Sequence, residues 1–293
     1  MPSSRSAPNR ISSTADAHKK QYNAPYQLRT VPVPHALGPT DLLVKVAAAS
    51  LCHTDGVVRA GAFHTALPCT ASHEGAGTVV AAGSAVMSLA PGARVMCGIP
   101  GRLCGRCADC TGPEARRHYC ANVGGHTGVT RDGCFAEFVR MDAVATVRLP
   151  DAVSFETAAP LACAGCTIWR GVLLADLKPG QWIAFVGSGG GLGHLGIQFA
   201  KARGLMVVGV DARDEGLALS KKVGADVVVD ARLGDEKVVE AVKKATGDVG
   251  ADVTVNVSDA QTAAATACAV TKMHGLMIQI AQVREDIGCC SLW

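Results

Sequence analysis

The chain lacks long apolar runs and an excess of either charge sign, two features that would indicate a membrane protein or a nucleic-acid-binding protein. Apolar runs are short: none reaches the ~18 residues that a membrane-spanning helix needs, so we expect no membrane partner. Neither charge sign dominates, because 28 Lys and Arg face 25 Asp and Glu, and the basic residues are spread out. This excludes the basic patch with which proteins hold nucleic acid. A composition of 48% hydrophobic and 18% charged residues instead indicates a soluble, globular protein.

The N-terminus also lacks an apolar secretion signal. Residues 1–24 are polar and Ser-rich, and we expect a disordered tail there. Arg5 and Arg10 among the serines leave a mitochondrial presequence open as an alternative to a cytoplasmic location. In a reducing compartment, the 13 cysteines are more typical of metal binding than of a disulfide framework.

Two styles of sequence meet near residue 150, so we expect two domains. Residues 25–154 are short β-like runs broken by Gly, Pro and polar turns, which predicts an irregular, mostly β domain. Residues 155–293 alternate apolar strands with helix-length segments, which predicts an α/β domain with a parallel sheet. Its five expected strands are residues 182–187, 205–211, 226–230, 252–257 and 276–280. A full doubly wound sheet has a sixth strand, whereas the last ten residues read as neither strand nor helix.

A glycine-rich turn follows the first of these α/β strands. Glycines there let the backbone reverse and let a pyrophosphate approach the N-terminus of the next helix. We predict cofactor contacts from the whole turn: Gly187, Gly189, Gly190, Gly191, Leu192 and Gly193. Asp211 ends the next strand, where a carboxylate can take the ribose hydroxyls and favours NAD over NADP. The spacing departs from strict G-x-G-x-x-G, so a turn without a ligand remains the alternative.

Four cysteines form a row in a hydrophilic stretch: Cys104, Cys107, Cys110 and Cys120. Two successive C-x2-C steps place three thiolates on one tight loop, and the fourth can fold back to them. Four thiolates suit a closed, tetrahedral zinc site, which is structural; an iron–sulfur cluster is the alternative.

Further candidate ligands are scattered: Cys52, His73 with Glu74, and Cys163. Taken singly, each fits a bland interpretation, as a buried cysteine or as a histidine satisfied within a turn. Together, two cysteines and one histidine are the ligand set of an open zinc site, whose fourth position is left for water or substrate.

With these motifs in order, the chain resembles the zinc-dependent alcohol dehydrogenases of the medium-chain dehydrogenase/reductase superfamily, closest to the yeast-like branch. The matching motifs are CHTD (52–55), HEGAG (73–77), the cysteine row, GHTGVTRDGCFAEF (125–138), LACAGCT (161–167), the glycine turn with GIQFAKARG (196–204), and VNVS (255–258). The resemblance implies a GroES-like catalytic domain with a structural zinc lobe over 25–154 and a Rossmann NAD-binding domain over 155–293.

The resemblance also implies the metal chemistry. Cys52, His73 and Cys163 correspond to the ligands of a catalytic zinc, and the cysteine row to those of a structural zinc, so we expect two Zn²⁺ per chain. Glu74 corresponds to a catalytic carboxylate that visits the metal, and Thr54 to the hydroxyl that bonds the alcohol oxygen.

On the cofactor side, His53 corresponds to a residue that contacts the pyrophosphate, and Thr167 to one near the nicotinamide. The implied reaction is hydride transfer between an alcohol and NAD⁺, giving an aldehyde or ketone. The family expectation for the assembly is a homo-dimer or tetramer.

Three positions near the implied site depart from the family pattern. Val57 stands where many relatives have a histidine that finishes a proton relay, so protons pass from Thr54 and the cofactor ribose to water, or His64 serves instead. Phe63 is expected to wall the substrate pocket. Gly101 stands where relatives often have a large aromatic, so we expect a pocket open to alcohols bulkier than ethanol.

Two departures concern length. Nine residues precede Cys120 in the cysteine row, more than is usual. Relatives also continue beyond the position where this chain ends, so we expect a C-terminal truncation that lacks the last strand and leaves a sheet edge exposed. Two alternatives to an alcohol dehydrogenase therefore stay open: a reductase of a bulky aldehyde or ketone, and a truncated, weakly active zinc- and NAD-binding protein.

Overall fold

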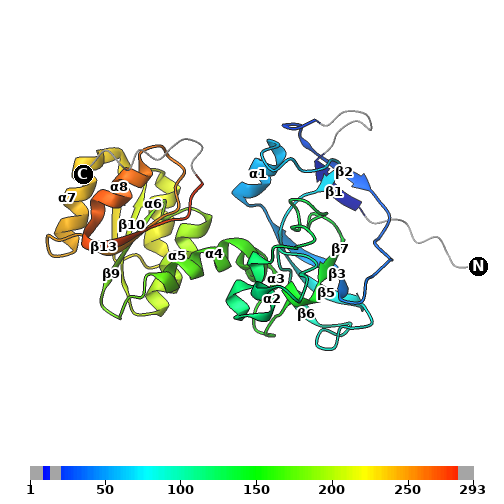
Figure 1. Cartoon of the computed structure of the whole chain (residues 1–293). Helices are drawn as coiled ribbons and strands as arrows, with labels where there is room; N and C mark the ends of the chain where they lie inside the picture. The colour runs from blue at the N-terminus through cyan, green and yellow to red at the C-terminus, as the bar shows by residue number, and fades with distance from the viewer. Residues whose placement is uncertain (1–8, 14–20, 283–293) are drawn as a thin grey trace, which may run out of the picture. The chain divides into compact units, whose positions relative to one another are not determined.

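The computed structural model describes residues 9–13 and 21–282 of the chain. The chain divides into two compact units, residues 1–163 and 164–293, and each is described by itself (Figure 1). The sequence placed this boundary between residues 154 and 155. The expectations for the rest of the N-terminal tail and for the last residues of the chain lie outside the described residues.

The first unit is built mainly from short strands. In chain order its elements are β1 (Asn9–Ser13), β2 (Tyr26–Thr30), β3 (Asp41–Ser50), α1 (His53–Arg59), β4 (Cys69–Thr70), β5 (Glu74–Ala82), β6 (Arg94–Met96), α2 (Ala108–Thr111), β7 (Phe138–Asp142), β8 (Val147–Arg148) and α3 (Phe155–Pro160), with 3-10 turns at Glu114–Tyr119 and Ala143–Ala145.

An antiparallel five-stranded sheet, in the order β7-β3-β5-β6-β8, forms the body of this unit. Side chains of a strand alternate between the two faces of a sheet, and Leu42 and Val44 of β3 lie two residues apart on the buried face. They pack with Val79, Val95 and Met141 of the neighbouring strands in one hydrophobic core. The prediction of an irregular, mostly β domain is confirmed.

A smaller sheet, in the order β2-β1-β4, corrects the expectation for the N-terminal tail. The prediction of disorder is wrong for residues 9–13, which form β1 and pair antiparallel with β2 and β4. The sequence NRISS has no apolar alternation from which a strand could be predicted, and the backbone pairing alone defines it. Tyr22 is also fixed, because its hydroxyl donates a hydrogen bond to the carbonyl of Thr65 at 3.2 Å.

The second unit alternates strands with helices. Its elements are α4 (Cys166–Leu174), β9 (Trp182–Val186), α5 (Gly191–Ala202), β10 (Met206–Asp211), α6 (Asp214–Lys222), β11 (Val227–Asp230), a 3-10 turn (Ala231–Leu233), α7 (Asp235–Ala245), β12 (Ala251–Asn256), α8 (Ala263–Val270) and β13 (Thr271–Gln279). The five predicted strands are all present.

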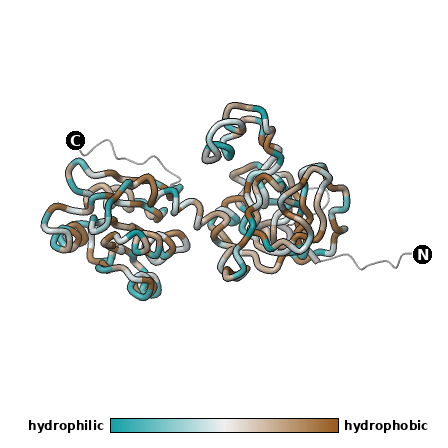
Figure 2. The backbone as a smooth tube through the Cα atoms, turned by 90° about the horizontal axis from the view of Figure 1, so that it is seen from below, coloured by the Kyte–Doolittle hydropathy of each residue, from teal (hydrophilic) through white to brown (hydrophobic). Residues whose placement is uncertain are grey.

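These strands form one parallel sheet in the order β11-β10-β9-β12-β13, with helices on both faces (Figure 1). Ile183 and Phe185 of β9 pack in a core with α4 and α5, whereas Ala184 and Val186 pack in a second core with α7 and α8. Hydrophobic stretches run through the middle of this unit (Figure 2). The chain leaves β9 toward β10 on one side and later returns to β12 on the other, so the carboxyl end of β9 is the topological switch point at which such sheets bind ligands.

One helical run, Phe155–Leu174, is long and apolar enough by length and composition to count as a candidate membrane span, with a mean hydropathy of 1.3 and 44% of its window buried. The run is not a continuous apolar stretch in the sequence, because polar residues, including Glu156 and Arg170, interrupt its apolar residues. Ala158 packs in a core of the first unit, and Ile168 packs in a core of the second. We therefore interpret this run as a core helix.

Candidate active site

Four potential metal ligands from separate segments of the first unit come together. One ligand atom from each of Cys52, His73, Glu74 and Cys163 lies within 4.8 Å of every other. Cys52 directly precedes α1, and His73 and Glu74 lie where β5 begins. Cys163 lies in a π-helical turn, Leu161–Gly165, between α3 and α4, a widened turn that often occurs at functional sites. The structure thus assembles the scattered ligands that the sequence singled out.

The buried carboxylate of Asp55 ties this cluster to the backbone. It accepts hydrogen bonds from the backbone N–H of Cys52 at 2.8 Å and of Ser72 at 3.0 Å, and it lies 3.8 Å from Nδ1 of His73. Burial raises the pKa of Asp55. Sequence reasoning gave Asp55 no role, although an acid three residues after a helix N-cap is a known capping signal.

A second polar contact holds Glu74. Ser50 ends β3 and pairs with Glu74 across the sheet, so the two side chains lie side by side on one face. The hydroxyl of Ser50 donates a hydrogen bond to Oε2 of Glu74 at 2.6 Å. Ser50 carried no signal in the sequence, because its role depends on the register of two strands.

The donor chemistry of the cluster fits a zinc ion. Both ring nitrogens of His73 are buried, and neither has a hydrogen-bond partner among the described residues, whereas buried polar atoms are normally paired. The thiol of Cys163 and, after it, the ring of His73 lower the pKa of Cys52 to about 3 against the effect of burial, which favours the thiolate that a zinc ion binds. Two sulfurs and an imidazole nitrogen are the donors of an open zinc site, and Glu74 stands beside them.

The cysteine row forms a second cluster with four donors. Its sulfur atoms all lie within 4.8 Å of one another, and those of Cys104 and Cys110 are 3.9 Å apart. The longer spacing before Cys120 is taken up by the 3-10 turn Glu114–Tyr119, which returns Cys120 to the other three. Burial, followed by the neighbouring thiols, raises the pKa of Cys110 to about 12. Four sulfur donors this close together fit a closed tetrahedral zinc site, in which a bound metal would hold them as thiolates.

In the second unit, the glycine turn links the carboxyl end of β9 to the N-terminus of α5. Gly187 has a φ of +89°, in the left-handed region that favours glycine. A Cβ on Gly189 would lie 2.1 Å from the Cα of Gly216, so this glycine allows the turn to pack on α6. A Cβ on Gly191 would meet nothing within 4 Å, so the start of α5 is open to a ligand. A helix N-terminus of this kind attracts a phosphate group.

The other residues of the turn serve its packing. A Cβ on Gly193 would lie 2.4 Å from the carbonyl oxygen of Gly187, and one on Gly190 would lie 3.2 Å from the same oxygen. Leu192 is partly buried and packs against the core of the second unit, and its contact with the cofactor stays a prediction.

Asp211 lies at the carboxyl end of β10, as predicted, and is 4% exposed. Its carboxylate accepts hydrogen bonds from the backbone N–H of Gly189 at 2.9 Å and of Arg213 at 3.0 Å, and the side chain of Arg213 adds a contact at 3.3 Å. Burial raises the pKa of Asp211, but these hydrogen bonds outweigh it and lower the pKa overall. The anionic carboxylate is thus tied to the glycine turn.

The other residues predicted for the site lie on α1, directly after α1, and on α4. His53 and Thr54 begin α1 directly after Cys52, and Val57 lies one turn after His53 on the same helix. Phe63 follows α1 with 39% of its surface exposed. Thr167 lies on α4 of the second unit and is exposed.

The structure places a side chain beside Gly101. A Cβ on Gly101 would lie 1.6 Å from Nη1 of Arg131, so a larger residue there would displace the end of that arginine. The wider substrate pocket expected at Gly101 stays a prediction. The sequence could not reveal this contact, because thirty residues separate the two positions.

Comparisons with known proteins agree with this fold and these clusters. The family described as "Alcohol dehydrogenase GroES-like domain" matches residues 38–151, and the one described as "Zinc-binding dehydrogenase" matches residues 191–289. An alcohol dehydrogenase of Geobacillus stearothermophilus is 39% identical over 246 residues, which are 82% of this chain and 70% of that protein. An alcohol dehydrogenase of Rhizobium meliloti (strain 1021) is 39% identical over 80% of this chain and 68% of that protein.

Solved structures give the same result. The alcohol dehydrogenase of the archaeon Aeropyrum pernix matches with a TM-score of 0.80 and 30% identity, over 95% of this chain and 80% of that one. A structure from Sinorhizobium meliloti 1021, described as a zinc-binding dehydrogenase bound to NADP, matches with a TM-score of 0.80 and 32% identity, over 97% of this chain and 80% of that one. The GroES-like and Rossmann units predicted from the sequence are confirmed.

Proposed function

The chain belongs to the zinc-binding alcohol dehydrogenase family and is a zinc oxidoreductase acting on alcohols, and from this we propose the role of each residue in the reaction. The hydride passes between an alcohol and NAD⁺, giving an aldehyde or ketone. The convergence of Cys52, His73, Glu74 and Cys163 carries the proposal, since two sulfurs, a buried imidazole without a hydrogen bond and a carboxylate meet within 4.8 Å. The assignment to the yeast-like branch stays a prediction.

Cys52, His73 and Cys163 hold the catalytic zinc in this proposal. When bound, the zinc supplies Lewis acidity, which lowers the pKa of an alcohol hydroxyl. Asp55 orients His73 and the turn at Cys52, because its buried carboxylate contacts both. Thr54, half-buried two residues after Cys52, offers the hydroxyl oxygen that takes the alcohol proton.

Glu74 and Val57 complete the site. Glu74 offers a carboxylate oxygen to the cluster while substrate is absent, and the hydroxyl of Ser50 fixes that carboxylate. With Val57 in place of a relay histidine, protons leave Thr54 by way of the cofactor ribose to water. His64 is the alternative acceptor and follows α1 with a φ of +51°.

The second unit holds the dinucleotide. The open face at Gly191 and the N-terminus of α5 receive the pyrophosphate. The family resemblance predicts a pyrophosphate contact for His53 and a place near the nicotinamide for Thr167, and both stay predictions. Asp211 takes the adenosine ribose hydroxyls and repels a 2′-phosphate, which favours NAD. Arg213 could attract that phosphate, but its side chain contacts the carboxylate of Asp211. The ratio of kcat/KM for NAD⁺ and NADP⁺ tests this preference.

The cysteine row holds a second, structural zinc, so the loaded chain carries two zinc ions. The closed set of four sulfur donors supports this role, because no position is left open for a substrate. Metal analysis of purified protein tests the stoichiometry.

We further propose a cytoplasmic homo-dimer or tetramer that takes a small-molecule alcohol or aldehyde. β11 and β13 are the two outer strands of the parallel sheet among the described strands, and an edge such as that of β13 can pair with a second copy. The described cysteines form no disulfide, which suits a reducing compartment. Light scattering of the purified protein tests the oligomer, and a monomer would contradict it.

The function itself is tested by NADH formation with ethanol, a longer primary alcohol and benzyl alcohol, and by NADH oxidation with the matching aldehydes. Metal content is measured on the same sample. We expect turnover in both directions. Protein that holds zinc and binds NADH but turns over no alcohol or aldehyde would favour the alternative of a weakly active binding protein.

A further inference from the structure

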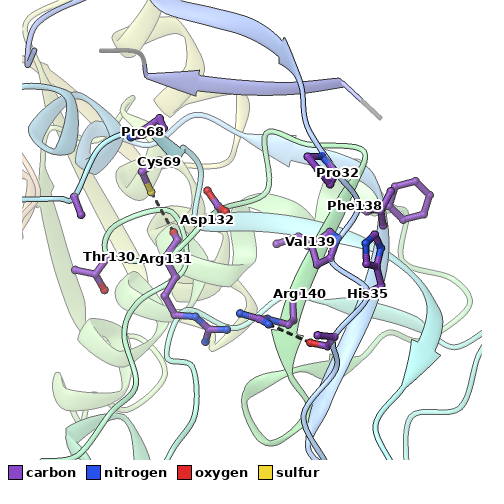
Figure 3. Close-up of a pocket in the computed structure, with 14 residues that line it drawn as sticks. Pro32, His35, Pro68, Cys69, Thr130, Arg131, Asp132, Phe138, Val139 and Arg140 are labelled. Atoms are coloured by element: carbon purple, nitrogen blue, oxygen red, sulfur yellow. Dashed lines mark hydrogen bonds between the residues drawn. The ribbon is translucent and has the colours of Figure 1, made fainter. Parts of the chain in front are cut away.

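A cavity of about 590 Å³ lies in the first unit, and its lining includes no residue of either ligand cluster (Figure 3). Its volume lies within the range of about 300–1,000 Å³ that is usual for small-molecule sites. Much of the lining is apolar and includes Pro32, Phe138 and Val139. The other part carries two arginines, Arg131 and Arg140, whose guanidinium groups point toward each other (Figure 3).

Three arginines, Arg131, Arg140 and Arg102, lie near two carboxylates, Asp41 and Asp142, at this end of the cavity. A carboxylate oxygen of Asp41 lies 3.9 Å from Arg102 and 3.8 Å from Arg140. Both distances exceed that of a hydrogen bond, and the same oxygen of Asp41 already accepts one from the backbone N–H of Gly38 at 2.9 Å.

Arg131 carries a buried nitrogen without a hydrogen bond. Its Nη1 is buried over Gly101 and has no hydrogen-bond partner among the described residues. Burial, followed by the charges of Arg140 and Arg102, lowers the pKa of Arg131. An arginine nevertheless stays protonated in a protein. The carboxylates of Asp41 and Asp142 act in the opposite direction but are outweighed, so part of a partly desolvated positive charge remains without a matching anion.

The acid that lines the cavity does not supply that anion. Asp132 accepts a hydrogen bond from the backbone N–H of Thr70 at 2.9 Å. Its carboxylate lies at the Cys69 end of the cavity, away from the two guanidinium groups (Figure 3). Arg140 is also only partly satisfied, because its Nη1 donates to the carbonyl of Ala36 at 3.2 Å and leaves other N–H groups available.

We propose that this cavity binds a small organic anion, with a carboxylate or phosphate group between Arg131 and Arg140 and an apolar body against Pro32, Phe138 and Val139. Two guanidinium forks match the geometry of such a group, and the anion would offset the positive charge that Asp41 and Asp142 leave uncompensated. The site is separate from the proposed dehydrogenase chemistry and does not depend on it.

The test is calorimetric titration of the zinc-loaded protein, saturated with NADH, with benzoate and with phenyl phosphate. NADH occupies the dinucleotide site, so phosphate binding at the glycine turn does not contribute. Benzamide serves as the neutral analogue. The benzoate and phenyl phosphate arms distinguish a carboxylate ligand from a phosphate ester, and we expect saturable binding of at least one of them and none of benzamide.

Arg140→Gln and Arg131→Lys should each weaken that binding about tenfold or more, the loss expected when a charge-assisted hydrogen bond is removed. Arg148→Gln is the matched control. It removes the same charge from β8, at the opposite edge of the same sheet, where Arg148 likewise donates to a carbonyl, that of Ser88. Its affinity should equal that of the wild type.

Three results would overturn the proposal: no saturable binding of either anion, an equal loss in Arg148→Gln, or full affinity in both cavity variants. The last result would place the anion at the zinc or elsewhere. Zinc content and thermal unfolding of each variant, measured in parallel, separate a lost contact from a lost fold, and the two cavity variants perturb the fold differently.

Discussion

Two glycines of the same turn should respond to the same substitution in opposite ways. Gly189→Ala places a Cβ 2.1 Å from the Cα of Gly216 and 2.2 Å from its carbonyl oxygen, so the backbone of α6 must move. Gly191→Ala places a Cβ where nothing lies within 4 Å. The first change therefore tests packing, and the second tests whether the open face receives a ligand.

The magnitudes follow from these distances. A Cβ normally stays at least ~3.4 Å from other heavy atoms, so Gly189→Ala demands a shift of more than 1 Å, and such overpacking costs about 1–3 kcal/mol or more. Gly191 begins α5, where alanine is favoured over glycine by about 0.5–1 kcal/mol, so Gly191→Ala should leave the fold at least as stable. The same Cβ would stand where the pyrophosphate approaches, and we expect NADH affinity to fall about tenfold, equivalent to ~1.4 kcal/mol.

Chemical denaturation and NADH titration by fluorescence measure the two effects on the same samples. The expected result is a lower denaturation midpoint for Gly189→Ala, and an unchanged or higher midpoint with weaker NADH binding for Gly191→Ala. Wild-type NADH affinity in Gly191→Ala would refute the assignment of this face to the dinucleotide. A wild-type midpoint in Gly189→Ala would refute the packing argument.

Three further changes test other parts of the account. Cys110→Ser should remove one zinc per chain by metal analysis, because a closed site loses one of its four donors; retention of both zincs would contradict this. Val57→His should raise the rate below neutral pH by restoring a relay group, and an unchanged pH–rate profile would argue against it. Asp211 has a lowered pKa in the fold, so its contribution to stability is complete above its ordinary pKa of about 3.9 and is lost as pH falls through the lower, folded value. The stability difference between wild type and Asp211→Asn should therefore shrink below about pH 3.9 in acid unfolding, and a constant difference would contradict the linkage.

The sequence predicted the second unit well because its information is local. Buried strands of a parallel sheet read as apolar runs, and the glycine turn directly follows one of them. The cysteine row is equally local, because two C-x2-C steps bring three sulfurs onto one loop. The scattered ligands were harder: Cys52, His73 and Cys163 became a site in the sequence only through the family resemblance, and the structure assembles them from three segments.

What the sequence missed depends on contacts between distant residues. Ser50 meets Glu74 only through the register of β3 and β5, and Gly101 lies beside Arg131 from a separate loop. The strand β1 is defined by backbone pairing rather than by a side-chain pattern. None of these can be predicted from composition or periodicity, because both describe neighbours along the chain.

The central claim is that Cys52, His73 and Cys163 hold the zinc on which alcohol oxidation depends. The most direct measurement compares Cys163→Ala with Cys166→Ala, a neighbouring cysteine that is exposed and outside the cluster. Zinc content, NADH binding and NADH formation from alcohol are measured on each. The account predicts that Cys163→Ala loses one zinc and its turnover but still binds NADH, while Cys166→Ala matches the wild type. Two zincs and wild-type turnover in Cys163→Ala would contradict it.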